Sequence, residues 1–359
     1  MIGAQAGSEA KGKTAAYLTS KYQPDLMVGS FSPNAGHTLV IDGNKVISHN
    51  VPVCSYLSNA PLILTAGSAI SLKVLKKDLK TCNIPKERLF IDNKAVIIQE
   101  KHIKEENEKL THIASTTSGT GAAYRDRLMR VKFPLLAEHF REEVSEIGNL
   151  IDASEMINDY LIDKKVVLGE MTQGFDLDLL HGIQFPFTTS RPINPAQLLS
   201  DSGVCPDKIG TIYAAFRPYP IRVGNHLGYS GPYAEAVEIN WHTVRNRCSA
   251  NSDLTEYTTT TQRVRRVFEF SYERFKKMMQ IVNPDWLVLN FANYLDWSVY
   301  GASDKSRITD TVNDFMNMIE DTFGIPVGLV GTGPNHEHII DLLYNYKKPT
   351  SRGLLYVRR

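Results

Sequence analysis

The sequence has few cysteines and no long apolar run, and both absences narrow the kinds of protein it can be. Its four cysteines, Cys54, Cys82, Cys205 and Cys248, show no CxxC or CxxH spacing, which indicates neither a zinc site nor a disulfide framework. Free thiols are expected instead. A membrane span would need about 18 uninterrupted apolar residues, and neither such a stretch nor a signal peptide is found. We therefore expect a soluble, cytoplasmic protein.

An excess of charge of either sign is also missing. Forty basic and 39 acidic side chains leave a net charge of +1, which provides no strong field for holding a polyanion such as DNA. Direct binding to nucleic acid or to a membrane is not expected, and any connection to nucleic acids should be metabolic. Apolar residues make up 42% and charged residues 22% of the 359 positions, as is usual for globular proteins with a sizeable core.

Short apolar, β-branched runs alternate with segments long enough to form helices. This alternation predicts an α/β fold with a central, mostly parallel β-sheet flanked by helices. No linker rich in proline, glycine or serine divides the chain, so one large domain over residues 1–359 is the simpler hypothesis. Strands are expected at residues 25–28, 39–41, 62–64, 95–98, 165–168, 286–289 and 326–330. Helices are expected at residues 13–20, 70–81, 100–110, 125–129, 135–146, 153–161, 272–282 and 306–323.

The strongest local motif is GSEAKGKT, which satisfies the pattern G-x-x-x-x-G-K-[ST] just before an amphipathic segment. Glycines that permit an unusual backbone path, amide groups at a helix start and a lysine near the outer phosphates together form a phosphate cradle. The motif predicts such a P-loop, and a chance match in a surface loop is the alternative. Its residues are Gly7, Ser8, Glu9, Ala10, Lys11, Gly12, Lys13 and Thr14.

Three further segments carry groups suited to chemistry. Residues 34–38 (NAGHT) place His37 on a glycine-containing turn, where a histidine can protonate a leaving oxygen near neutral pH. Residues 115–121 offer hydroxyls and amides that suit a second phosphate. Residues 258–266 place threonines beside arginines, whose planar guanidinium groups can hold a carboxylate in fixed geometry. Taken singly, each segment could also be an ordinary loop.

Taken in order, these segments resemble the adenylosuccinate synthetase family, from Gly3 to about Asn335. Residues 7–13 are similar to the family's phosphate loop GDEGKGK, residues 34–38 to its NAGHT segment, and residues 116–130 to its TT…G…AYEDK…R segment with a one-residue gap. Residues 169–174, 177–178 and 186–190 resemble EGAQG…LD…PYVTSS, residues 219–224 match YxxRVG, residues 260–266 match TTGRxRR and residues 331–334 match STGP.

The resemblance implies a carbon–nitrogen ligase that requires Mg²⁺ and works in two steps. A nucleoside triphosphate first phosphorylates the 6-oxygen of a purine nucleotide, and the amine of L-aspartate then displaces that phosphate. The 6-oxo group is a poor leaving group until it carries a phosphoryl group, so a phosphate loop and an aspartate pocket belong in one protein. The resemblance also implies a homodimer.

Site residues are implied position by position. His37 takes the place of the general acid, with Ser8 and Lys13 as further catalytic positions, and Ser8 and the Gly36 carbonyl fall on magnesium positions. The triphosphate positions are the whole phosphate loop, Gly36, His37, Thr38, Arg265, Asn290, Asn293, Gly331 and Gly333. The purine monophosphate positions are Ser8, Asn34, Ala35, Thr116, Thr117, Gln173, Thr189, Arg263 and, reaching across the dimer interface, Arg130. The aspartate positions are Thr259, Thr260, Thr261, Gln262, Arg263 and Arg265.

Ser8 departs from the family pattern, in which this position is an aspartate that takes the proton from purine N1 and touches magnesium. A serine is a poor base, so either the enzyme is inactive or its acceptor is not IMP, and the completeness of the other motifs favours the second. A guanine acceptor has a 2-amino group that needs space beside N1, and a hydroxyl can both donate and accept. The change resembles the phage branch of the family, the 2-aminoadenylosuccinate synthetases, which use dGMP and L-aspartate on the route to the DNA base 2-aminoadenine.

The donor site departs as well. The family usually reads the guanine of GTP with a TKxD segment whose aspartate accepts from N1 and the 2-amino group. The aligned residues are Asn290, Phe291, Ala292 and Asn293, so that paired acceptor is missing, while an amide can bond adenine. We expect ATP or dATP as donor and dGMP as acceptor, in the host cytoplasm if the protein is phage-encoded. The alternatives are an ordinary adenylosuccinate synthetase acting on IMP with GTP, an inactive nucleotide-binding relative, and a P-loop ATPase or kinase.

Overall fold

The computed structural model describes residues 1–258 and 262–343, and two five-stranded sheets form its centre. One has the order β1 (Ile2–Gly3), β11 (Tyr213–Phe216), β15 (Trp286–Leu289), β16 (Val327–Gly331) and β17 (Ile339–Asp341). The other has the order β10 (Val167–Met171), β2 (Leu26–Ser30), β5 (Leu62–Leu64), β7 (Leu89–Asp92) and β9 (Asn149–Ile151). The sheets meet where the Met171 amide donates to the Met1 carbonyl at 3.2 Å.

Neighbouring strands in both sheets are parallel, apart from the antiparallel pair β16 and β17. Parallel strands need long crossover connections, and helices supply them here. The expected α/β class, with a central, mostly parallel sheet flanked by helices, is confirmed.

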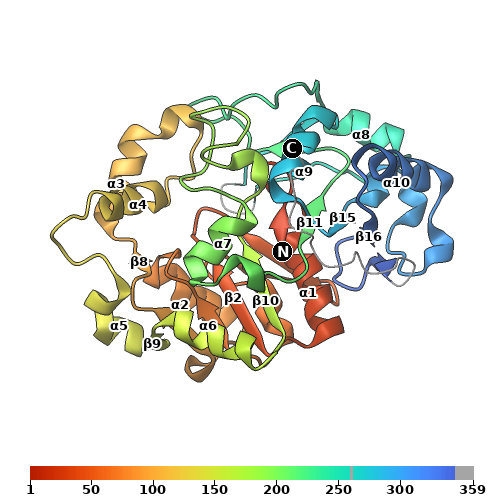
Figure 1. Cartoon of the computed structure of the whole chain (residues 1–359). Helices are drawn as coiled ribbons and strands as arrows, with labels where there is room; N and C mark the ends of the chain where they lie inside the picture. The colour runs from red at the N-terminus through yellow and green to blue at the C-terminus, as the bar shows by residue number, and fades with distance from the viewer. Residues whose placement is uncertain (259–261, 344–359) are drawn as a thin grey trace, which may run out of the picture.

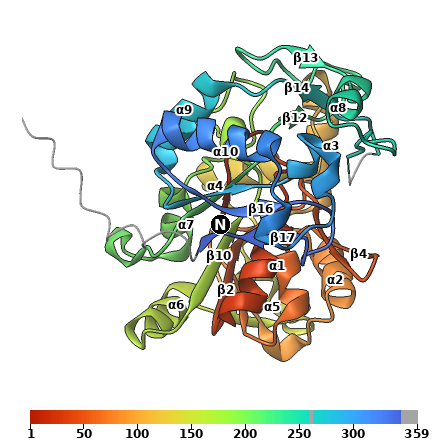
Figure 2. The same cartoon turned by 90° about the vertical axis from the view of Figure 1, so that its right-hand side faces the viewer.

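Helices cover both faces because successive strand residues point to opposite sides of a sheet. Met27 of β2 packs with α1 and α2, whereas its neighbour Val28 packs with α6. Helices α9 and α10 lie together over one face of the first sheet (Figure 1), and α1 packs on the other face beside β16 and β17 (Figure 2). These helices are α1 (Lys11–Tyr22), α2 (Leu72–Thr81), α6 (Ala153–Ile162), α9 (Tyr272–Val282) and α10 (Asp310–Phe323).

Smaller elements surround this centre. Strands β3 (His37–Ile41) and β4 (Asn44–Ser48) form a hairpin, β6 (Ala69–Ile70) pairs with β8 (Val96–Ile97), and β14 (Arg266–Phe268) lies between β12 (Ile221–Arg222) and β13 (Glu238–Ile239). The strands expected at 39–41 and 95–98 therefore exist but lie outside the two central sheets. The remaining α-helices are α3 (Glu100–Lys109), α4 (Thr120–Leu128), α5 (Arg141–Ser145), α7 (Pro195–Ser202) and α8 (Trp241–Arg247).

The helix expected over residues 135–146 is only partly present. Its first residues are extended, because the Leu135 carbonyl accepts from the Ile97 amide and the amides of Leu135 and Leu136 donate to Nδ1 of His139. A 3₁₀ turn at Ala137–Phe140 and the short α5 follow. Tertiary bonding has thus overridden the helical pattern.

The sequence predicts neither disulfides nor a membrane-spanning helix. All four cysteines are free, which confirms the expectation of unpaired thiols. No helix in the described part of the chain combines the length and apolar character needed to cross a bilayer.

Candidate functional site

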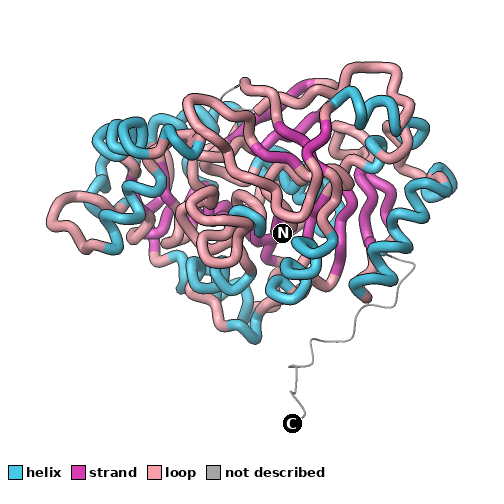
Figure 3. Tube along the Cα trace, turned by 90° about the horizontal axis from the view of Figure 1, so that it is seen from above, coloured by secondary structure: helices cyan, strands magenta, loops and turns pink. Residues whose placement is uncertain are grey.

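The loops that carry the sequence motifs leave one edge of the central sheets. The phosphate loop follows β1, the segment that leads to His37 follows β2, Thr172 follows β10, and Asn290 and Thr332 follow β15 and β16. The carboxyl ends of parallel strands meet at the same edge, and ligands bind at this edge in open α/β sheets. Figure 3 shows loop segments crossing the middle of the molecule among the strands.

The phosphate loop is built around the buried carboxylate of Glu9. Its Oε1 accepts from the amides of Gln5 at 3.1 Å and Gly7 at 2.8 Å, and its Oε2 accepts from Nζ of Lys11 at 2.9 Å. Ser8 has a left-handed φ of 62°, and α1 begins within the phosphate-loop motif, at Lys11. Glu9 and Lys11 therefore stabilise the conformation of the loop. In a triphosphate site they would set the shape of the loop and would not contact the ligand.

Gly174 lets the segment after β10 press against this loop, and we expect Gly174→Ala to destabilise the protein. A Cβ atom at Gly174 would overlap the Gln5 carbonyl oxygen and Oε1 of Glu9, and overpacking of this kind costs about 1–3 kcal/mol. Gly210→Ala is the matched control, because no atom lies within 4 Å of the added Cβ. Denaturant unfolding of both variants measures the difference, and equal stabilities would contradict the expectation.

Lys13 and Asn290 tie the start of α1 to β15 and β16. Nζ of Lys13 donates to the carbonyls of Gly333 at 2.6 Å and His338 at 2.8 Å. Nδ2 of Asn290 donates to the Glu9 carbonyl at 2.8 Å and to Oγ1 of Thr14 at 3.0 Å. The Gly331 position faces Lys13 and Asn290 together, since an added Cβ would meet both side chains. The structure thus brings predicted triphosphate positions from three separate motifs into contact.

The charge of Lys13 should depend on pH near neutrality, because burial lowers the pKa of its amine to about 7. A bound triphosphate would favour the charged amine and raise this pKa again. Triphosphate affinity should then be fully present below pH 7 and fall by about tenfold per pH unit above it, until the pH passes the pKa of the complex.

Calorimetric titration with a triphosphate between pH 6 and 9 measures this dependence. Lys13→Arg is the control, because an arginine stays charged throughout this pH range. Protonation of the triphosphate itself affects both proteins equally, so a difference between their profiles reports on Lys13. Identical pH profiles for the two would contradict the assignment of the effect to Lys13.

His37 is the first residue of β3 and lies almost wholly buried against the end of β10. Its Nδ1 lies 3.4 Å from Oε1 of Glu170, and its Nε2 lies 3.4 Å from Oγ1 of Thr172. Helix α1 packs on the same turn, where the Gly12 position faces His37 and the carbonyl of Thr38. Glu170 and Thr172 belong to the segment that resembles EGAQG, but the sequence pattern assigned no role to either.

Two predicted acceptor residues, 155 positions apart, meet in the structure. Nδ2 of Asn34 lies 3.4 Å from Oγ1 of Thr189, and Ala35 continues the same turn. Thr117 and Gln173 both have left-handed φ angles, of 48° and 63°, which are uncommon for such side chains and often mark functional sites. Their roles in holding a nucleotide stay predictions.

The amides that follow Thr116 and Thr117 are not available to a phosphate as the sequence suggested. The Glu106 carboxylate from α3 accepts from the amides of Gly119 at 2.7 Å and Gly121 at 2.6 Å. It occupies the amino end of α4, where an anion is stabilised by free amides and the helix dipole. The two glycine amides are therefore already bonded, whereas the hydroxyls of the segment do not contact Glu106.

A buried charge cluster that the motifs did not reveal connects the phosphate loop to the predicted aspartate loop. The fully buried guanidinium of Arg217 donates to the Ser8 carbonyl at 3.2 Å and to both oxygens of Glu256. Arg265 donates to Oε2 of Glu256 at 2.8 Å. Burial raises the pKa of Glu256, but Arg217 and Arg265 outweigh burial and hold it at about 2. Arg217 directly follows β11, and neither Arg217 nor Glu256 lies within a motif singled out in the sequence.

Thr258 closes the base of the predicted aspartate loop. Thr258 accepts at Oγ1 from the Arg263 amide at 2.9 Å, and its own amide donates to the Arg263 carbonyl at 2.8 Å. Gln262 donates its amide to the Thr258 carbonyl at 3.0 Å. The predicted aspartate residues Thr259, Thr260 and Thr261 lie outside the described residues.

Two further predicted positions, Arg130 and Asn293, lie in different surroundings. Arg130 is exposed directly beyond the carboxyl end of α4, and its reach into a second subunit stays a prediction. Asn293 is 4% exposed and carries no hydrogen bond from its side-chain amide to the residues in 1–258 or 262–343. The side-chain amide is not among the fully buried groups that lack a partner, so water or a ligand can reach it and complete its hydrogen bonds.

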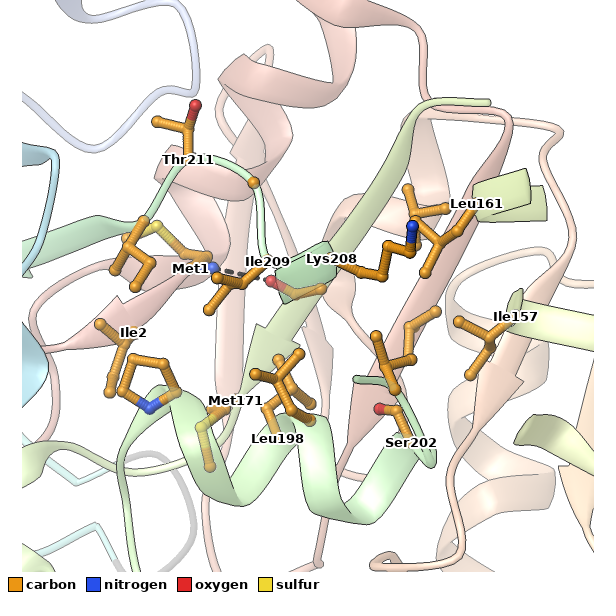
Figure 4. Close-up of a pocket in the computed structure, with 18 residues that line it drawn as sticks. Met1, Ile2, Ile157, Leu161, Met171, Leu198, Ser202, Lys208, Ile209 and Thr211 are labelled. Carbon is orange, nitrogen blue, oxygen red and sulfur yellow. Dashed lines mark hydrogen bonds between the residues drawn. The ribbon is translucent and has the colours of Figure 1, made fainter. Parts of the chain in front are cut away.

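An apolar cavity of about 170 Å³ lies elsewhere, between the two sheets and α7 (Figure 4). Its wall includes Ile2, Met171, Leu198 and Ile209, with Lys208 as its charged residue. A triphosphate needs several polar donors, which this lining does not supply. The cavity is therefore separate from the candidate nucleotide site.

Comparison with known sequences gives matches along almost the whole chain. A family model described as adenylosuccinate synthetase matches residues 1–142 and 135–299. The adenylosuccinate synthetase of Pyrococcus horikoshii is 32% identical over 348 residues, covering 95% of this chain and 97% of its own. That of Methanococcus maripaludis is 34% identical over 349 residues, covering 95% and 98%.

Two solved structures have a similar fold. The succinoaminodeoxyadenylate synthetase of cyanophage S-2L, bound to dGMP and to dATP as an energy donor, has a TM-score of 0.81 and 27% identity, covering 95% of this chain and 94% of that one. The fully ligated adenylosuccinate synthetase of Plasmodium falciparum has a TM-score of 0.81 at 20% identity, covering 95% and 98%. By its sequence matches and its fold, the chain belongs to the adenylosuccinate synthetase family.

Proposed function

We propose that this protein joins L-aspartate to carbon 6 of dGMP, with ATP or dATP as phosphoryl donor, and so makes the precursor of 2-aminoadenine nucleotides. The choice of dGMP as acceptor rests on Ser8, which lies in the phosphate loop at the position where the family has an aspartate. A carboxylate at this place could grip both N–H groups of guanine in the ground state, which tightens binding without lowering the barrier. The cyanophage relative with bound dGMP supports the same acceptor.

The donor proposal rests on Asn293. The residue is nearly buried in the turn that follows β15, and its side-chain amide makes no hydrogen bond to the described residues. An amide offers one donor and one acceptor to adenine N1 and N6, whereas guanine needs a paired acceptor for its N1–H and 2-amino groups. The dATP bound by the cyanophage relative supports an adenine donor.

In this proposal each residue has a limited task. His37 delivers a proton to the phosphate as it transfers, Lys13 neutralises the outer phosphates, and Arg263 and Arg265 hold the carboxylates of L-aspartate. Ser8 and the Gly36 carbonyl are hard oxygen donors, which suit Mg²⁺ when phosphates and water complete its shell. When bound, Mg²⁺ would neutralise charge on the transferring phosphate.

The proposal includes a homodimer in which Arg130 of each subunit reaches the acceptor phosphate of the other, and a cytoplasmic location. An ordinary adenylosuccinate synthetase acting on IMP with GTP is the second candidate, because the sequence relatives at 32% and 34% identity carry that name.

Product mass after incubation with dGMP, ATP, Mg²⁺ and L-aspartate tests the proposal directly, with IMP and GTP measured in parallel. We expect a succinylated 2-amino product and faster turnover with dGMP. Faster turnover of IMP with GTP would reject the proposed substrates in favour of the second candidate. Phosphate release without any need for L-aspartate would instead indicate a P-loop ATPase or kinase.

A further inference from the structure

Glu170 is a buried carboxylate without the hydrogen bonds that usually accompany one. It lies in β10, is 1% exposed, and its Oε1 has no hydrogen-bond partner within residues 1–258 and 262–343. Its polar contacts include Nδ1 of His37, 3.4 Å from Oε1, and the Cys54 thiol, whose Sγ lies 3.8 Å from Oε2. The buried amino terminus of Met1 also interacts electrostatically with this carboxylate. Burying a carboxylate is costly, so its position beside His37 calls for a physical reason.

We propose that Glu170 is a positioning residue that fixes the tautomer and the direction of the His37 ring. This inference rests on the proposed function, in which His37 is the general acid. A carboxylate beside Nδ1 keeps a proton on that nitrogen, as the aspartate does in catalytic triads. The other nitrogen, Nε2, is then left for chemistry and for the Thr172 hydroxyl at 3.4 Å.

The surroundings of the ring support this orientation. Phe31 contacts the ring edge-on, with ring centroids 4.8 Å apart, and α1 closes the side of the turn at Gly12. The charged groups that α1 brings near are committed elsewhere, since Lys11 bonds to Glu9 and Lys13 bonds to main-chain carbonyls. Glu170 is the ion-pair partner of His37 in the described part of the chain.

The first test reads the tautomer in the wild-type protein. Nitrogen-15 NMR of histidine-labelled protein, with the His37 signal assigned from its loss in His37→Ala, distinguishes a ring protonated at Nδ1 from one protonated at Nε2 alone. We expect a proton on Nδ1. A ring without a proton on Nδ1 overturns the proposal, and this result does not depend on the folding of any Glu170 variant.

The second test uses Glu170→Gln, which keeps the shape of the side chain and removes its charge. We expect kcat to fall by about 10-fold or more, with the KM for nucleotide unchanged and the Nδ1 proton signal reduced. Cys54→Ala is the matched control, because it alters the other neighbour of the same carboxylate and should leave kcat, KM and the tautomer as in the wild type. A kcat for Glu170→Gln equal to that of the wild type overturns the proposal.

The two proposals fail in different ways. If His37→Ala retains full activity, the general-acid role of His37 in the proposed function is wrong. If His37→Ala is inactive while Glu170→Gln matches the wild type, only the positioning role of Glu170 is wrong. A loss of nucleotide binding together with kcat in Glu170→Gln would indicate a structural role and also overturn the inference.

Discussion

Replacing His37 by alanine is expected to lower the rate of phosphate release by about 10²- to 10⁴-fold, which is the usual contribution of a positioned general acid. The 6-oxygen and the transferring phosphate carry negative charge that needs a proton, and the structure places the His37 ring at the strand edge shared with the phosphate loop. Nucleotide binding should fall far less than the rate, because Lys13 and the loop amides, which are also predicted triphosphate contacts, are untouched. Single-turnover phosphate release in the presence of L-aspartate and acceptor measures the effect.

His242→Ala is the control for this prediction, because it removes an exposed histidine from α8. An inactive relative that only binds nucleotides would show the same phosphate release before and after His37→Ala. Unchanged release would therefore contradict the enzyme assignment as well as the role of His37. A large loss in His37→Ala with none in His242→Ala would support both.

The fold could be predicted largely because its strands are local signals. The apolar runs that form β2, β5, β10, β15 and β16 are evident in the sequence, and each of these strands lies in a central sheet. Strand β11 (Tyr213–Phe216), an interior strand of one sheet, was not predicted from the sequence, and neither were β1, β7, β9 and β17. Two of the four residues of β11 are alanine, which has a low strand propensity, and Pro218 and Pro220 follow closely. Pairing with β1 and β15 defines this strand, and that information is tertiary.

The site could be predicted where a motif gives both its residues and their arrangement. The phosphate-loop motif is of this kind. The family resemblance names Asn34 and Thr189 separately as acceptor positions, and only the structure shows that their side chains lie 3.4 Å apart. The bond of Glu106 to the α4 amides and the cluster of Arg217 with Glu256 could not be predicted, since each joins charges from separate segments. A single sequence shows that a charge is present, but its buried partner is set by packing.

Asn293→Asp is expected to move the donor preference from ATP toward GTP, with a change of about 10²-fold or more in the ratio of kcat/KM values. A carboxylate accepts from both guanine N1–H and the 2-amino group, but it cannot donate to adenine N1. The position is nearly buried, so a base that leaves the side chain unsatisfied loses the full value of those bonds. Initial rates with ATP and GTP at a fixed acceptor concentration measure the ratio.

The added charge needs its own control, because a carboxylate near phosphates could weaken every triphosphate alike. Asn313→Asp places the same change on the exposed face of α10 and should leave both donors unaffected. General repulsion at position 293 would lower ATP and GTP use in parallel and leave their ratio constant. Only a change in ratio reports base recognition, so a constant ratio would remove Asn293 from the donor site even if the variant were less active.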